Sequence, residues 1–274
     1  WATAHLLPLH KALLPTLQAP AVHLSSERVI NVISMYGKDG AETYRDLEVW
    51  LELLNALAAA YPDNVDIQLN LAKGTVNAIA SYGSGGPVYF LEVESSLARL
   101  ESLARIHSQF EFQLRLAMGA VNAINAYGSS GSVHLSDMER CLKRLEVVVA
   151  AHSDHSEFQF ALAKGAFNAC IHYNRGGLEN MAELAHWLER LVELPEPWPG
   201  EMHLLLQSTF ARLQQVALAA NNNLPPEYHS QFQAFLRLCL RYPELPLGQT
   251  SDGRPFTTGM YAAQFLPDQD EAAA

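Results

Sequence analysis

The stretch LAKGTVNAIASYGSGG, from Leu71 to Gly86, decides the fold because the chain repeats it. LAMGAVNAINAYGSSG follows at Leu116–Gly131 and LAKGAFNACIHYNRGG at Leu162–Gly177, and RVINVISMYGKDG at Arg28–Gly40 is a shorter version. The equivalent asparagines are 46, 45 and 46 residues apart, at Asn31, Asn77, Asn122 and Asn168. A nearly constant period of this size is typical of stacked helix pairs.

The period predicts an all-α fold, an α-solenoid of helix-pair repeats. Four repeats are expected at about residues 25–62, 63–107, 108–152 and 153–198, after an N-terminal segment or cap at 1–24. In the second repeat, the first helix is typified by Asp66–Tyr82 and the second by Val88–His107. Residues 199–243 keep the apolar rhythm but lose the repeated asparagine, so we expect a degenerate fifth repeat that acts as a cap. Residues 244–274 are expected to form an irregular tail.

Glycine recurs at three places in the repeat. At the end of the first helix lie residue types that tolerate a left-handed backbone, namely Gly83, Gly128 and Asn174. A second glycine, such as Gly86 or Gly131, then permits a tight turn. Glycine inside a helix costs up to about 1 kcal/mol relative to alanine. We therefore expect close approach of a neighbouring helix, rather than of a ligand backbone, at Gly74, Gly119 and Gly165.

Two other periodic residue types are interpreted as structural. On a helical wheel, a glutamine lies in the middle of the apolar arc, at Gln68, Gln113 and Gln159. A polar group there needs a partner, and the end of the preceding helix offers backbone groups. The repeated tyrosine closes the first helix against the second, so we expect core positions for Tyr36, Tyr82, Tyr127 and Tyr173.

The asparagine lies on a narrow non-apolar stripe of the first helix. In the second repeat this stripe is Asn70, Lys73, Asn77 and Ser81. An asparagine can both donate to and accept from a peptide bond, so a stacked ladder of asparagines could bind a peptide. Alternatively, each asparagine bonds the adjacent repeat's backbone and fixes the stacking. If the stripe binds a ligand, the candidate contacts are Asn31, Lys73, Asn77, Arg115, Asn122, Lys164, Asn168 and His172.

The signature L-x-x-G-x-x-N, followed by tyrosine, a glycine turn and a leucine-rich helix, resembles an elongated tetratricopeptide repeat. The armadillo and HEAT repeats are a second choice on the basis of the period. The first resemblance implies a right-handed superhelix whose first helices line a groove for peptides or proteins. Some tetratricopeptide domains hold a C-terminal carboxylate with lysine and asparagine one turn apart, a spacing matched by Lys73–Asn77 and Lys164–Asn168.

Composition excludes several other classes of protein. The 274 residues are 49% apolar and 17% charged, with a net charge of −11, which argues against nucleic acid or an anionic membrane as the partner. There is no apolar run of about 18 residues, and the start of the chain lacks a signal-peptide pattern. Three distant cysteines favour reduced thiols and a cytoplasmic location.

No motif for catalysis, a cofactor or a metal is found, so we expect neither an enzyme nor a resident cofactor. The HSDH stretch at 152–155 is interpreted as a polar connector, with His152 at a helix end. The expected function is non-catalytic binding of a protein or peptide, including one with a free carboxylate or other acidic group. The alternatives are a structural or self-associating module, and a regulatory arm of a larger effector or enzyme.

Overall fold

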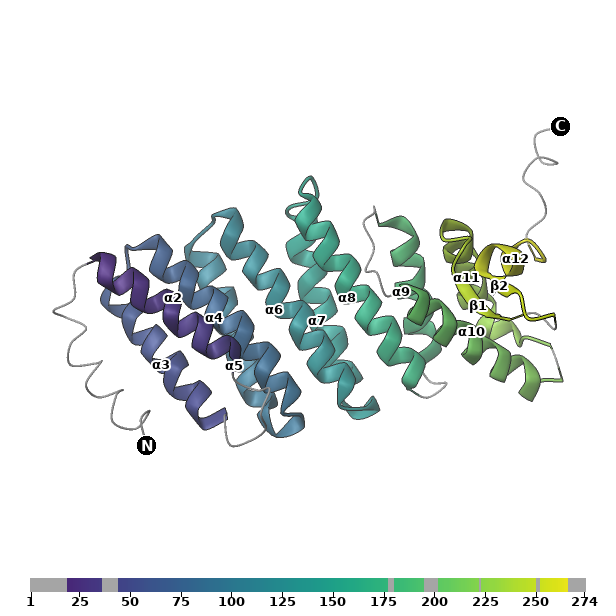
Figure 1. Cartoon of the computed structure of the whole chain (residues 1–274), viewed down its shortest axis with the longest axis horizontal. Coiled ribbons are helices and arrows are strands. Elements are labelled where there is room, and N and C mark those ends of the chain that lie inside the picture. Colours follow the sequence, from purple (N-terminus) through teal and green to yellow (C-terminus); the bar gives the residue numbers. More distant parts are fainter. Residues whose placement is uncertain are drawn as a thin grey trace. The chain divides into compact units, whose positions relative to one another are not determined.

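The computed structural model describes residues 19–35, 44–176, 180–194, 202–221, 223–249 and 252–265. Within these ranges the chain is mostly α-helical, with one pair of short strands (Figure 1). It divides into two compact units, residues 1–161 and 162–274, with the boundary inside helix α8 (Ser156–Arg175). None of the helices in the described ranges is long and apolar enough to cross a membrane.

The first unit consists of pairs of antiparallel helices. The first helices of the pairs are α2 (Ala19–Met35), α4 (Val65–Ser84) and α6 (Phe110–Ser129). The second helices are α3 (Tyr44–Ala60), α5 (Phe90–Ile106) and α7 (Leu135–Ala150). Two 3₁₀ turns, η3 (Pro87–Tyr89) and η4 (Ser132–His134), lead into α5 and α7.

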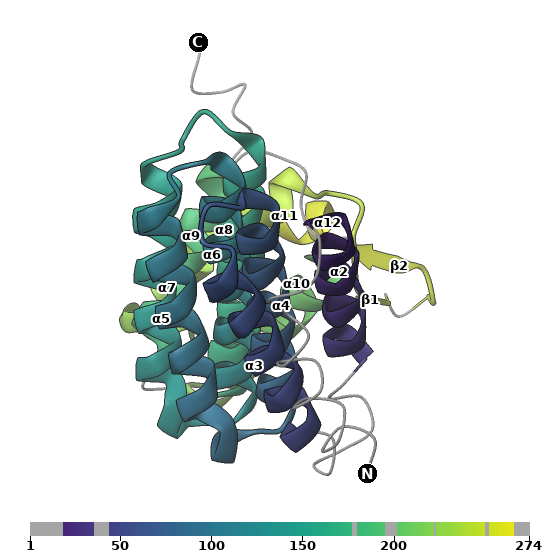
Figure 2. The ribbon, with the colours of Figure 1, turned by 90° about the vertical axis from the view of Figure 1, so that its left-hand side faces the viewer.

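The contacts between these helices follow a regular order. α4 packs against α2 and α6, and these three helices form what we name the first-helix layer. Helices α3, α5 and α7 form the second-helix layer, and in Figure 2 α5 and α7 lie to the left of α2, α4 and α6. α3 contacts α2 and α4, and α5 contacts α4 and α6. A second helix therefore lies against the first helix of its own pair and that of the next pair.

Glycines inside α4 and α6 permit this packing. A Cβ atom on Gly74 would lie 2.5 Å from Leu54 Cδ2, and one on Gly119 would lie 2.4 Å from Leu100 Cδ1. Both leucines are buried and come from the second helix of the preceding pair. The expectation that these glycines mark close helix packing is confirmed.

The glycines of the turns differ from the expectation. Gly86 and Gly131 have φ values of 81° and 97°, so the left-handed backbone is at the second glycine of each turn. Gly83 and Gly128 instead lie within α4 and α6, each of which extends further than expected. A Cβ atom on Gly83 would lie 2.5 Å from Ala126 Cβ. Gly83 is therefore a position of close contact between α4 and α6.

The periodic glutamines bond to the backbone, as expected. Nε2 of Gln68 donates to the carbonyl of Ala58 at 2.8 Å, near the end of α3. Gln113 donates to the carbonyl of Ala104 at 2.8 Å, near the end of α5, and Gln159 donates to that of Ser153 at 3.1 Å. The carbonyls of Ala58 and Ala104 are among those that a helix end leaves without an intrahelical partner, and that of Ser153 lies in the turn after α7.

The repeated tyrosines are core residues, as expected. Tyr82, Tyr127 and Tyr173 are all buried, whereas Tyr36 lies outside the described residues.

Two histidines of the first unit pack against aromatic rings at helix ends. His107 stacks on Phe112 and His152 on Phe158, with ring centroids 4.5 and 4.6 Å apart.

The second unit contains the rest of α8, followed by α9 (Met181–Glu193), α10 (Met202–Ala219) and α11 (His229–Arg241). Helix α11 packs against α9 and α10. The strands β1 (Pro246–Gln249) and β2 (Pro255–Thr257) pair antiparallel, with Gly248 opposite Phe256, and α12 (Thr258–Ala262) follows.

The C-terminal segment returns to these helices. The ring of Tyr261 lies 4.8 Å from that of Phe210 on α10, and that of Phe265 lies 5.0 Å from that of Phe232 on α11. The expectation of an irregular tail from residue 244 is therefore wrong for its described part. Paired strands and a helix carry aromatic side chains onto the apolar surface of α10 and α11.

Candidate functional site

The repeated asparagines of the first unit differ in exposure. Asn31 on α2 is exposed, and Asn77 on α4 and Asn122 on α6 are half-buried. Nδ2 of Asn122 donates to the carbonyl of Val76 on α4, at 3.2 Å across 46 residues of sequence. One of its two amide hydrogens therefore joins neighbouring first helices, while its Oδ1 keeps acceptor capacity.

The stripe around Asn77 is narrower than the helical wheel indicates. Asn70 is buried and donates to Ser26 Oγ on α2 at 2.8 Å, and Ser81 is also buried. Lys73 is half-buried, as is Asn77. A helical wheel takes no account of neighbouring helices, and α2 covers part of the stripe on α4.

Arg115 on α6 is half-buried, and its Nη1 lies 3.3 Å from Met118 Sδ. Burial lowers its pKa, and the nearby Glu111 acts in the opposite direction. The guanidinium stays charged, because this pKa starts above 12.

The remaining predicted contacts belong to the second unit. Lys164 is exposed and Asn168 is half-buried. His172 has only 5% of its surface exposed, so its placement on an open stripe needs correction. Burial, together with the charge of Arg175, lowers the pKa of His172 to about 4, so the imidazole is neutral at pH 7.

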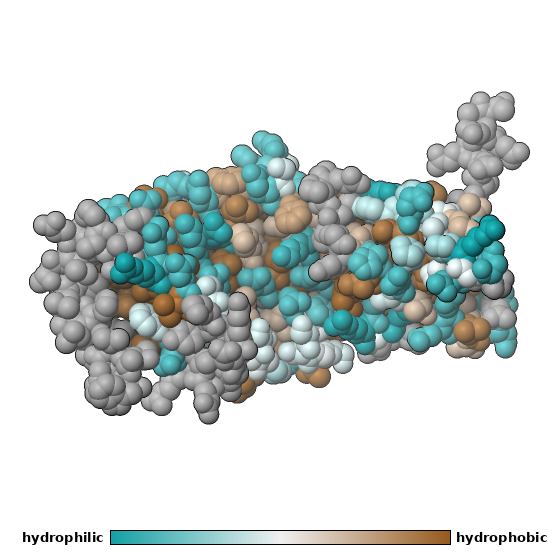
Figure 3. Space-filling model, in the orientation of Figure 1, coloured by the Kyte–Doolittle hydropathy of each residue, from teal (hydrophilic) through white to brown (hydrophobic). Residues whose placement is uncertain are grey.

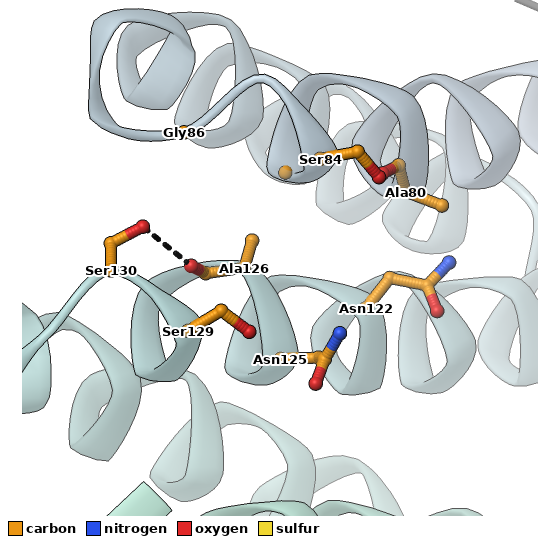
Figure 4. A pocket seen from close by; sticks show the side chains of 9 residues that line it. Ala80, Ser84, Gly86, Asn122, Asn125, Ala126, Ser129 and Ser130 are labelled. Carbon is orange, nitrogen blue, oxygen red and sulfur yellow. Dashed lines mark hydrogen bonds between the residues drawn. The ribbon is translucent and has the colours of Figure 1, made fainter. Parts of the chain in front are cut away.

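A cleft of about 390 Å³ lies between the C-terminal halves of α4 and α6 (Figure 4). On the face of the molecule drawn in Figure 3, hydrophilic and hydrophobic residues are interspersed. Small residues line part of the cleft, namely Ala80, Gly83, Gly86 and Ala126. Its polar lining consists of Ser84, Asn122, Asn125, Ser129 and Ser130.

The polar side chains that line this cleft are uncharged. Ser84 Oγ donates to the carbonyl of Ala80 at 3.0 Å and Ser130 Oγ to that of Ala126 at 3.1 Å, so both hydroxyls keep lone pairs as acceptors. The small residues leave room for a chain to approach the helix backbone closely. Amides and hydroxyls of this kind suit the peptide groups of a bound segment.

Of the predicted contacts, the cleft includes Asn122 alone. Asn77, Lys73 and Arg115 are not among its lining residues. The sequence reasoning missed Asn125, because alanine occupies its position one repeat earlier, at Ala80. A search for residues that recur excludes a residue that occurs once. The serines were visible in the turn sequences YGSGG and YGSSG but were interpreted only as turn residues.

The cysteine thiols are weakly reactive in this structure. The three cysteines are buried, and burial raises the pKa of Cys141 and of Cys239 to about 12 and that of Cys170 in the same direction. A protonated thiol is a weak nucleophile. No group of three or more metal-ligating side chains is found in the part of the chain that the structure describes.

Comparison of this chain with protein-family models, with curated protein sequences and with solved structures found no match.

Proposed function

We propose that the chain is a non-catalytic scaffold that binds a protein or peptide partner through its first-helix layer. The observation that carries the proposal is the polar cleft between α4 and α6 that contains Asn122. The proposal includes a right-handed solenoid related to tetratricopeptide repeats. It is supported by the order of contacts α2–α4–α6 and by the hydrogen bond that spans one repeat, from Asn122 to Val76.

The partner is an extended segment whose main chain lies in the cleft. The cleft has the size of a small-ligand pocket, a class that covers roughly 300–1,000 Å³. Its uncharged lining recognises peptide groups rather than a charged side chain. Lys73 on α4 and Arg115 on α6 add positive charge to the same layer. A segment with a free C-terminal carboxylate or acidic side chains is therefore the favoured partner.

To test the proposal, peptides with free C-termini are selected from a random library for binding to the wild-type protein. Their affinity is then measured for the wild type and for two variants. Ser129→Trp places an indole in the cleft, whereas Ser132→Trp, three residues further on, adds the same group outside its lining. We expect Ser129→Trp to weaken binding at least tenfold and Ser132→Trp to leave it unchanged. Equal affinity for both variants would refute the cleft as the binding site.

A second candidate function is a structural or self-associating module in which asparagines hold the repeats together. The same bond from Asn122 to Val76 favours it. Asn122→Ala is then expected to lower the free energy of unfolding by about 1 kcal/mol, the usual contribution of one hydrogen bond. Sedimentation of the wild-type protein measures self-association directly. A monomer at all concentrations, together with an unchanged unfolding free energy of Asn122→Ala, would contradict this alternative.

A further inference from the structure

The second-helix layer of the first unit contains two junctions built from equivalent residues. The second junction joins α5 to α7 and is closed by an ion-pair network. Nη2 of Arg144 lies 2.7 Å from Glu94 Oε1, and its Nε lies 3.3 Å from Glu101 Oε1. The hydroxyl of Tyr127 donates to Glu94 Oε2 at 3.4 Å.

A second guanidinium completes this closed junction. Nη2 of Arg140 lies 3.0 Å from Asp137 Oδ1 and 3.8 Å from Glu94 Oε2. Nδ1 of His134 also lies 3.3 Å from Asp137 Oδ2. Arg140 therefore pairs with two of the three carboxylates of the junction, Glu94 and Asp137, at once.

The first junction joins α3 to α5 and has the same design without that guanidinium. The repeat period places Glu48 at the position of Glu94, Glu92 at that of Asp137 and Arg99 at that of Arg144. The position of Arg140 is Ser95, and that of His134 is Tyr89. The ring of Tyr89 packs 4.2 Å from that of Tyr44. Both groups that hold Asp137 are thus replaced by uncharged residues.

The first junction is correspondingly open. It contains a pocket of about 410 Å³ lined by Glu48, Glu52, Tyr82, Glu92, Ser95 and Arg99. Among the described residues, the acceptor Glu92 Oε2 is buried and has no hydrogen-bond partner, whereas both oxygens of the equivalent Asp137 are paired. Buried charged atoms without a partner are costly. The carboxylate oxygen of Glu92 therefore indicates a missing hydrogen-bond donor.

Tyr82 points to the same conclusion. Only 3% of this residue is exposed, it lines the pocket, and its hydroxyl has no hydrogen-bond partner among the described residues, whereas the equivalent Tyr127 donates to a carboxylate. Burial, followed by the charges of Glu48 and Glu92, raises the pKa of Tyr82. The phenol and these carboxylates therefore share one space.

We propose that the pocket between α3 and α5 binds a guanidinium group, presented by an arginine side chain of a partner peptide. The bound guanidinium takes the place that Arg140 fills at the closed junction. It donates to Glu92 Oε2 and faces Glu48, with the phenol of Tyr82 as one wall. The carboxylates of Glu48 and Glu92 line the pocket together with one resident guanidinium, that of Arg99, so the charge of the pocket favours a cation. A planar fork that donates to two carboxylates favours arginine over lysine.

The test titrates the wild-type protein with the blocked tripeptide Gly-Arg-Gly, using calorimetry. Counterparts with lysine or with uncharged citrulline in place of arginine are measured alongside, together with agmatine, a small guanidinium compound. We expect the arginine peptide to bind at least tenfold more tightly than the citrulline peptide, and more tightly than the lysine peptide. Equal binding of the arginine and citrulline peptides would overturn the proposal. Tighter binding of agmatine would overturn a peptide as the source of the guanidinium.

Matched variants locate the binding. Glu92→Gln is expected to weaken it at least tenfold, and the equivalent change at the closed junction, Asp137→Asn, to leave it unchanged. Ser95→Arg supplies the missing guanidinium within the chain, so it should abolish binding and raise the melting temperature. Unaltered binding by Glu92→Gln or Ser95→Arg would contradict the site. The pocket shares no residue with the α4–α6 cleft, so Ser129→Trp should leave arginine binding intact, and the two proposals fail separately.

Discussion

The two junctions of the second-helix layer show how a repeat can vary its chemistry while its frame stays constant. Both have a glutamate from the preceding second helix, a buried tyrosine and an arginine at equivalent positions. At the α5–α7 junction these groups are linked by ion pairs and a hydrogen bond. At the α3–α5 junction they line a pocket.

The difference arises from positions that surround the shared groups. Arg140 and Glu101 at the closed junction correspond to Ser95 and Asn55 at the open one. Arg144 thus has two carboxylate partners, whereas no carboxylate described in the structure lies within ion-pair distance of Arg99. The contacts of Gly74 with Leu54 and of Gly119 with Leu100 recur from one repeat to the next, whereas the ion-pair network is described at the α5–α7 junction alone.

The largest expected contrast is in stability. Glu94→Ala should lower the free energy of unfolding by about 1–2 kcal/mol, because it leaves Arg144 half-buried with one partner fewer and Arg140 with Asp137 alone. Glu48→Ala, the equivalent change at the open junction, should alter it by less than about 0.5 kcal/mol. Urea unfolding of both variants measures the difference. Equal losses would mean that the first junction is also closed in solution.

A smaller contrast is expected for the two tyrosines. Tyr127→Phe removes the hydrogen bond to Glu94 and should cost about 0.5–1 kcal/mol, since that bond is long and half-buried. Tyr82→Phe removes a hydroxyl that has no described partner and should be nearly neutral. The same urea titrations apply, with both rings kept so that packing is unchanged. A larger loss for Tyr82→Phe than for Tyr127→Phe would reverse the comparison.

Sequence reasoning predicted the parts of the molecule that recur. Gly74 and Gly119, the glutamines and the buried tyrosines follow the period because every pair of helices must solve the same packing problem. Gly83 was assigned wrongly, since α4 continues beyond it and the left-handed residue is Gly86. The strands β1 and β2 were missed because four and three residues are too few for an alternating pattern to be recognised.

The functional surfaces depend on what does not recur. Asn125 in the cleft and Ser95 in the pocket differ from their counterparts in neighbouring repeats. Their importance depends on which side chains surround them, and that information comes from packing rather than period. The asparagine ladder drew attention to the first-helix layer, but it gave no reason to compare Ser95 with Arg140.

The smallest expected effect concerns pH and sharpens the comparison at the closed junction. Burial raises the pKa of Glu94. The hydrogen bond and charge of Arg144, together with the charge of Arg140, lower it by a larger amount, so the net pKa lies below the ordinary 4.5. A carboxyl with a depressed pKa in the folded state stabilises the fold above its unfolded pKa and loses that contribution as the pH falls. The stability advantage of the wild type over Glu94→Gln should therefore be present at pH 7 and shrink, by less than about 1 kcal/mol, between pH 5 and pH 3. An advantage over Glu94→Gln that stays constant to pH 3 would show that Glu94 contributes through packing and not through its charge.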